Sequence, residues 1–305
     1  MRGTLFFRQA ELLLSILPYF KEEKNFALKG GTAINFYVQN LPRLSVDIDL
    51  TYLPINERNQ ALKDISATVV RVAERLNQHY PEIKVTFKHL QHDDTIVGFI
   101  AKSHNVSVKV EPNLIVRGSV YPPVEMKLCT KAEDLFERSL SNQALSVADL
   151  YGGKICAALD RQHPRDLFDI YILFKNGGIT EEIRRAFIVY LISHPRPIVE
   201  LLNPGLKDLS GIFEIEFKGM TTIHHKIDDL VQTRLELIHF MKHSLNEKER
   251  RFLLSIKQIK PEWELLELEH IKNLPAVHWK LLNLEKMDKA KHSKAVAKLR
   301  SFLEM

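Results

Sequence analysis

Several common structural devices are absent from this sequence. It has only two cysteines, Cys129 and Cys156, which lie among apolar residues without the spacing of metal ligands. A disulfide framework is therefore excluded, and we expect both thiols to stay reduced, as in a cytoplasmic protein. No apolar run is long enough to span a membrane, and no charged segment followed by an apolar one marks an N-terminal signal, so no membrane partner is expected. Internal repeats and low-complexity segments are also absent.

The composition is that of a globular protein. The chain has 305 residues, of which 45% are hydrophobic, so it is long enough for two domains with a sizeable core. Its formal net charge is +5 and its pI is about 9.0. A charge of this size permits an anionic partner such as RNA but does not require one.

The most informative stretch is Phe26–Pro54, which reads FALKGGTAINFYVQNLPRLSVDIDLTYLP. Its apolar start, Phe26 to Leu28, predicts the end of a strand. Gly30 and Gly31 then predict a turn where the backbone can approach a ligand closely. The helical pattern from Thr32 to Val38 would direct backbone N–H groups toward an anion above the glycines.

Acidic and apolar residues alternate after this helix. Asp47 and Asp49 are two residues apart on an extended segment, so both carboxylates point to one side, while Ile48 and Leu50 point to the other. Two close carboxylates repel each other unless a cation lies between them, and oxygen ligands suit Mg²⁺. The combination predicts a site for a nucleoside triphosphate with its metal. The competing interpretation is an ordinary turn followed by a solvated strand face.

The pattern G-G-T…R-x-S-x-D-x-D resembles the signature of the nucleotidyltransferase superfamily. In this form it is similar to the AbiEii/AbiGii type of toxin nucleotidyltransferase from bacterial toxin–antitoxin systems. The resemblance implies an enzyme that transfers a nucleotide from an NTP to an acceptor and releases pyrophosphate. It also implies that the Gly30-Gly31-Thr32 turn and Ser45 bind the nucleotide.

A later segment offers a third carboxylate. In Val106–Glu111 the valines face one way, while Lys109 and Glu111 face the other. If this strand lies beside Asp47 and Asp49, Glu111 completes a set of three metal ligands. The alternative is that Lys109 and Glu111 only face solvent.

A second block, DLYGGKICAALDRQHPRDLFDIYIL, predicts two helices joined by a tight turn. Lys154 and Arg161 are seven residues apart on the first helix and share a face, and Asp166 and Asp169 are neighbours on the second. This arrangement is compatible with a salt-bridge cluster that is purely structural. However, K-x-C-A-A-L-x-R…P-R-D-L-x-D resembles the second conserved block of the same family, which implies functional roles for Lys154 and Asp169.

We therefore predict an α/β (α+β) fold, with a nucleotidyltransferase-like core built on a small mixed sheet and a mostly helical C-terminal region. The expected domains are residues 1–125 and residues 126–305, the second contributing Lys154 and Asp169 to the active-site cleft. The predicted roles are as follows: catalysis by Asp47, Asp49, Lys154 and Asp169; nucleotide binding by Gly30, Gly31, Thr32, Ser45, Lys154 and Arg161; and binding of Mg²⁺ or Mn²⁺ by Asp47, Asp49 and Glu111.

The acceptor and partners follow from the resemblance alone. It implies an RNA acceptor, the 3′ end of tRNA, and a cognate antitoxin protein. Transfer to a protein hydroxyl, and nucleotide or RNA binding without catalysis, remain alternatives. The lysine-rich segment 280–300 either follows RNA phosphates or is an ordinary solvated helix face.

Overall fold

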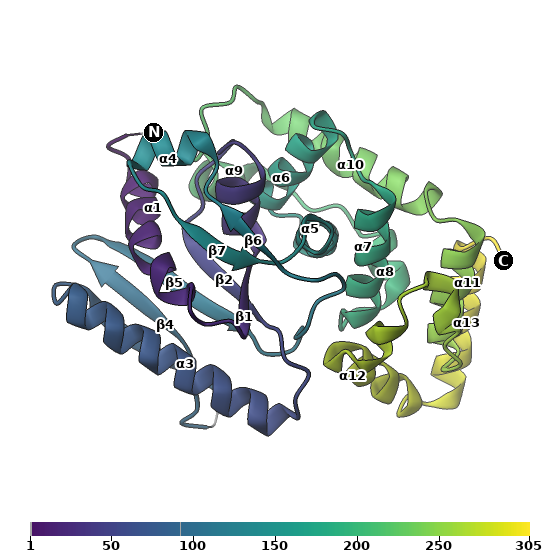
Figure 1. Cartoon of the computed structure of the whole chain (residues 1–305). Coiled ribbons are helices and arrows are strands. Elements are labelled where there is room, and N and C mark those ends of the chain that lie inside the picture. The colour runs from purple at the N-terminus through teal and green to yellow at the C-terminus, as the bar shows by residue number, and fades with distance from the viewer. Residues whose placement is uncertain (1, 92) are drawn as a thin grey trace. The chain divides into compact units, whose positions relative to one another are not determined.

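The computed structural model describes residues 2–91 and 93–305, which divide into two compact units (Figure 1). The first comprises the chain up to Leu150 together with Phe217–His224, and the second comprises Tyr151–Glu216 and His225–Met305. None of the helices in the described part of the chain is both long and apolar enough to cross a membrane.

The first unit is built on a mixed sheet of seven strands in the order β3-β4-β5-β2-β1-β7-β6. The pairs β1–β7 and β2–β5 are parallel, and the other neighbouring pairs are antiparallel. The strands are β1 (Phe26–Lys29), β2 (Asp47–Tyr52), β3 (Lys84–His89), β4 (Ile96–Ser103), β5 (Val106–Asn113), β6 (Val124–Lys127) and β7 (Ser141–Ala144).

Helices of this unit pack against the apolar side of the sheet, where α1 contacts β5 and α3 contacts β4 (Figure 1). Thr4 caps α1 by accepting a hydrogen bond from the Phe7 amide at 3.2 Å, and α3 buries an apolar stripe. The helical elements are α1 (Leu5–Ile16), η1 (Leu17–Phe20), α2 (Gly30–Ala33), the π-helical turn η2 (Ile34–Val38), α3 (Arg58–His79) and α4 (Thr130–Phe136).

The second unit is helical throughout its described elements. Its first helix, α5 (Val147–Arg161), begins in the first unit. The others are α6 (Pro164–Lys175), α7 (Glu181–Ser193), α8 (Ile198–Leu202), α9 (Ser210–Glu216), α10 (Ile227–His243), α11 (Glu247–Lys257), η3 (Trp263–Leu266), η4 (Glu269–Asn273), α12 (Pro275–Glu285) and α13 (Lys289–Phe302).

The predicted α/β class, with a mixed sheet followed by helices, is confirmed. The sequence did not predict β6 and β7, and the expected boundary after residue 125 lies inside β6. These two strands extend the sheet through the pairing of β7 with β1. Helix α10 begins only at Ile227, and Thr221 ahead of it forms a β-bridge with Arg43.

Two adjacent glycines in α5 differ sharply in the space around them, which leads to a stability prediction. A Cβ on Gly152 would lie 2.7 Å from the backbone nitrogen of Phe187 in α7, whereas a Cβ on Gly153 would approach only the Tyr190 ring, at 3.5 Å. Gly152→Ala should therefore lower the free energy of unfolding by about 1–3 kcal/mol through overpacking. Gly153→Ala, the matched control, should leave it unchanged or raise it by up to about 1 kcal/mol. Urea unfolding of both variants tests this, and equal effects would contradict the assigned packing.

Candidate functional site

The glycine turn of the first unit lies directly over strand β2. Gly30 has φ of +70°, which favours glycine. A Cβ built on Gly30 would lie 2.5 Å from Oδ2 of Asp49, and one on Gly31 would lie 2.6 Å from Nη2 of Arg43 and 3.2 Å from Oγ of Ser45. Both glycines are therefore required by the close approach of β2 side chains and of the loop before β2.

The two predicted carboxylates lie on one face of β2. Asp47 and Asp49 are half-buried, whereas Ile48 and Leu50 between and beyond them are buried. The alternation read from the sequence is thus confirmed. The two aspartates lie close to the glycine turn, and their carboxylates remain partly accessible to solvent.

Strand β5 brings Glu111 beside this pair. In the parallel β2–β5 ladder Asp49 is the register partner of Glu111, and Asp47 is the partner of Lys109. Residues paired across neighbouring strands point to the same side of a sheet, so the expected neighbourhood of Asp49 and Glu111 is observed. The Glu111 carboxylate forms an ion pair with Lys88 of β3 at 2.6 Å, and its role as a metal ligand stays a prediction.

Two buried hydroxyls fix the turn to the strand. The Thr32 hydroxyl lies 3.0 Å from Oγ of Ser45 and donates to the backbone carbonyl of Asp47 at 2.5 Å. Thr32 is 1% and Ser45 is 7% exposed, so both hydroxyls lie beneath the surface. The structure therefore brings these predicted nucleotide-binding residues together, with a visible role in holding the turn.

Arg43 and Lys29 belong to this neighbourhood but were not among the predicted site residues. Arg43 is buried, and its Nη1 donates to the carbonyl of Leu44 at 2.8 Å. Lys29, at the end of β1, is the register partner of Asp49. Both positions carry a signal in the sequence, since Arg43 belongs to the R-x-S-x-D-x-D pattern and Lys29 directly precedes the glycines.

The loop that contains Arg43 is held by a distant segment of the same unit. The amide of Leu44 donates to the carbonyl of Met220 at 2.8 Å, and the hydroxyl of Thr221 donates to the carbonyl of Pro42 at 2.6 Å. Residues 217–224 thus help to hold the loop that precedes β2. This long-range contact was not visible in the sequence.

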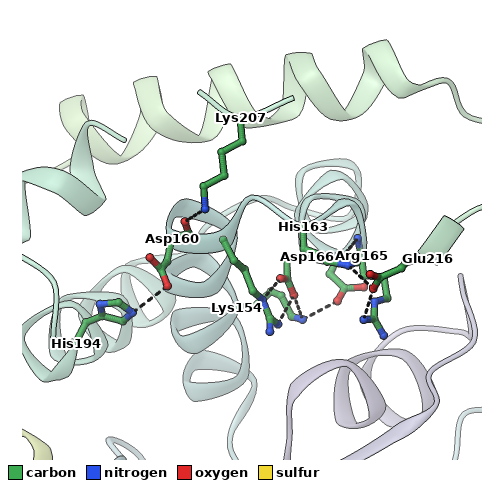
Figure 2. Close-up of polar contacts among 10 residues, drawn as sticks. Lys154, Asp160, His163, Arg165, Asp166, His194, Lys207 and Glu216 are labelled. Carbon is green, nitrogen blue, oxygen red and sulfur yellow. Dashed lines mark hydrogen bonds and ion pairs between the residues drawn. The ribbon is translucent and has the colours of Figure 1, made fainter. Parts of the chain in front are cut away.

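The second predicted block forms a buried ionic cluster within the second unit (Figure 2). The Nζ of Lys154 lies 2.7 Å from Oδ1 of Asp166 and 3.0 Å from Oδ2 of Asp169. Arg161 adds a second cation to Asp166, with Nε 2.5 Å from Oδ2 and Nη2 3.1 Å from Oδ1. The predicted proximity of the two basic and two acidic groups is confirmed.

The charged side chains of this cluster differ in how deeply they are buried. The Lys154 side chain is 5% exposed and those of the two aspartates are 2% or less, whereas the Arg161 side chain is 62% exposed. Burial alone would raise the pKa of Asp166, but the Lys154 ammonium and then the Arg161 guanidinium lower it well below its usual range. Asp166 is thus fully ionised at neutral pH.

The acidic pair fits a divalent cation that also contacts a substrate. Across residues 2–91 and 93–305, no group of three or more His, Cys, Asp or Glu side chains is arranged to hold a metal ion. Mg²⁺, however, is commonly bound by one or two carboxylates together with water and substrate phosphates. Asp47 and Asp49, two oxygen donors on one strand face, match that mode of binding.

The sequence matches one known family over most of its length. Residues 11–281 match the family described as nucleotidyl transferase AbiEii toxin of type IV toxin–antitoxin systems. No curated protein matches the chain. Among solved structures, MenT4, a nucleotidyltransferase toxin from Mycobacterium tuberculosis H37Rv, is similar with a TM-score of 0.56 and 14% identity, over 95% of this chain and 92% of that one. This structural likeness supports the fold.

The ionic cluster generates a prediction about stability. Lys154→Met should lower the free energy of unfolding by about 3–5 kcal/mol, because it leaves two buried carboxylates without their shared cation. Arg161→Met is the control, and its loss should not exceed about 1 kcal/mol because the side chain is largely solvated. Chemical unfolding at neutral pH measures both. Similar small losses in the two variants would contradict the buried network.

The lowered pKa of Asp166 has a consequence for acid stability. The folded protein holds Asp166 ionised to lower pH than the unfolded chain does, in which an aspartate has a pKa of about 3.9. Its stabilising contribution is therefore complete above that pH and is lost as pH falls toward the folded pKa, since the unfolded state binds more protons. Asp166→Asn should be less stable at neutral pH and should lose less stability on acidification. An unchanged acid profile, followed by unfolding at several pH values, would contradict this assignment.

Proposed function

The chain belongs to the AbiEii family of nucleotidyl transferase toxins, and from this premise we propose that its acceptor is RNA, the 3′ end of a tRNA. The protein is thus a nucleotidyltransferase toxin of a toxin–antitoxin system, with an NTP substrate and an antitoxin as its partner. The proposed transfer joins a nucleotide to an RNA hydroxyl and releases pyrophosphate. The observation that carries the proposed chemistry is the close approach of the Gly30 turn to the Asp49 carboxylate, whereas the RNA acceptor is proposed from the family alone.

The glycine turn and the acidic face of β2 have complementary tasks in the proposed reaction. Gly30 and Gly31 let the turn lie directly against the side chains of Asp49 and Arg43, and the backbone N–H groups of this turn are the proposed contacts of the triphosphate. The buried Thr32–Ser45 hydroxyl pair keeps this turn in place. Arg43, whose guanidinium lies beside Gly31, supplies positive charge close to the same turn.

We propose Mg²⁺, or Mn²⁺ in its place, as the cofactor held by Asp47 and Asp49. When bound, such a cation lowers the pKa of an attacking hydroxyl and offsets the charge of the leaving pyrophosphate. Glu111 is the proposed third ligand because it is the register partner of Asp49. Its ion pair with Lys88 would have to open for that role.

Lys154 and Asp169 are proposed as further catalytic residues on the strength of the family's second motif. The ammonium of Lys154 is fixed by two carboxylates, so its direction is well defined before substrate binds. Asp169 would orient it, and Arg161, with its exposed side chain, is the proposed second cation for the nucleotide. Transfer rates of Lys154→Arg, which keeps the charge and changes its shape, test this role separately from stability.

The two alternatives differ in acceptor or in chemistry. A non-catalytic binding module is disfavoured because both carboxylates are present on one face of β2. Transfer to a protein hydroxyl would use the same site and is separated only by experiment. Incubation of the enzyme with α-labelled NTPs and either total RNA or total protein distinguishes the acceptors.

The first expected outcome concerns that incubation. Label should enter RNA of tRNA size and should be removed by ribonuclease but not by protease. Label that resists ribonuclease and is released by protease would mean that the acceptor is a protein. Absence of label in either fraction, across all four NTPs and both metals, would favour the binding module.

The second concerns the acidic pair. Asp47→Asn and Asp49→Asn should each lower the transfer rate by roughly a thousandfold, which corresponds to about 4 kcal/mol of transition-state stabilisation. Their melting temperatures should not fall, because each change removes one of two repelling carboxylates. Glu82→Gln, an exposed carboxylate of the same unit, is the control and should keep full activity. A near-normal rate in either aspartate variant would remove the pair from the mechanism.

A further inference from the structure

Strands β3, β4 and β5 present a basic face to solvent. Along β5 and the second half of β4 the residues alternate between buried and more exposed positions, and along β3 from Lys84 to Lys88 they alternate between exposed and half-buried ones. The two sides of this part of the sheet therefore differ in chemistry. The buried side consists of apolar residues such as Phe99 and Val110. The other side carries Lys84, Thr86 and Lys88 on β3, Ile100 and Lys102 on β4, and Ser107 and Lys109 on β5, all of them exposed.

The strand register joins this face to the acidic pair. Asp47 is the partner of Lys109, Lys109 is the partner of Ile100, and Ile100 is the partner of Thr86. A second row runs from Ser107 through Lys102 to Lys84. Since strands lie about 4.8 Å apart, the row that begins at Asp47 reaches β3 within roughly 15 Å. The lysines and the carboxylates thus lie on one continuous face.

The lysines of this face are available to an anion. Lys84, Lys102 and Lys109 form no ion pair with any residue that the structure describes, whereas Lys88 is occupied by Glu111. Ile100, with 38% of its surface exposed, is an apolar residue between them. Uncompensated cations around an apolar centre match a polyanion that also has flat apolar groups, which is the chemistry of a nucleic-acid strand.

We propose that Lys84, Lys102 and Lys109, together with Ile100, form the docking surface for the acceptor RNA, here called the basic sheet face. The lysines contact backbone phosphates, and Ile100 contacts a ribose or base. The surface directs the RNA end toward Asp47 because Lys109 is the register partner of that residue. This inference rests on the proposed function, in which the acceptor is RNA.

Helix α13 offers a competing basic surface, with exposed Lys291, Lys294 and Lys298. These residues are spaced at i, i+3 and i+7, so they share one helix face. The basic sheet face is favoured because its strand register connects it to the proposed metal ligands. The test therefore includes a separate charge-reversed α13 variant, Lys291→Glu/Lys294→Glu/Lys298→Glu.

The test compares full-length variants with equal changes in net charge. The test variant is Lys84→Glu/Lys102→Glu/Lys109→Glu. The control is Lys21→Glu/Lys24→Glu/Lys63→Glu, which reverses three exposed lysines elsewhere in the same unit. The neutral variant Lys84→Gln/Lys102→Gln/Lys109→Gln guards against misfolding through repulsion. Binding of 5′-fluorescein-labelled tRNA is measured by anisotropy without nucleotide over a range of salt concentrations, together with KM for tRNA and for NTP.

The expected result is at least a tenfold rise in Kd and in KM for tRNA in the test variant, with KM for NTP and the melting temperature unchanged. The neutral variant should show a smaller rise. In the test variant the magnitude of the slope of log K against log salt concentration should fall by about 2, since each of the three lost single-strand phosphate contacts contributes roughly 0.7. Equal losses in the test and control variants would overturn the proposal, because they would reflect net charge alone. So would a loss confined to the α13 variant.

The failure of this inference and that of the proposed function give different results. If the wild-type enzyme labels RNA and the sheet variants bind and react with tRNA normally, only the docking surface is wrong. If the wild-type enzyme labels protein, the acceptor is wrong, and the RNA surface is rejected with it.

Discussion

The site depends on one close approach, that of the Gly30-Gly31 backbone to strand β2. A Cβ on Gly30 would lie 2.5 Å from Oδ2 of Asp49, so any other residue would displace either the turn or the carboxylate. The hydroxyl contact from Thr32 to the carbonyl of Asp47 fixes the same separation from beneath. Steric exclusion and hydrogen bonding thus act together, and both place the glycine turn next to an acidic strand face.

Local patterns in the sequence were sufficient to predict how the residues at the centre of this site are arranged. The two-residue period predicted that Asp47 and Asp49 share a face, and the same period in Val106–Glu111 predicted the direction of Glu111. Strands β6 and β7 were missed because they are short, largely polar and stabilised by pairing with the sheet rather than by a pattern of their own. Contacts between distant segments, such as Leu44 with Met220, have no local signature.

The second motif shows why a conserved-looking charge pattern needs a structure before a role can be assigned. Spacing predicted that Lys154, Asp166 and Asp169 would meet, and they do. It could not predict that the lysine would be almost completely buried while Arg161 remains solvated. Burial makes the ion pairs costly to break, so the ammonium is oriented more firmly than a surface lysine, whichever task it performs.

The segment Phe217–His224 belongs to the first unit although the residues on either side of it belong to the second. The chain therefore passes between the units three times, and neither unit is one continuous piece of the gene. A protein cut after Leu150 would lose the hydrogen bonds that Met220 and Thr221 make to the loop around Arg43. The sheet-containing unit therefore cannot be excised at a single position in the chain, and any truncation before Phe217 removes part of it together with most of the helical unit.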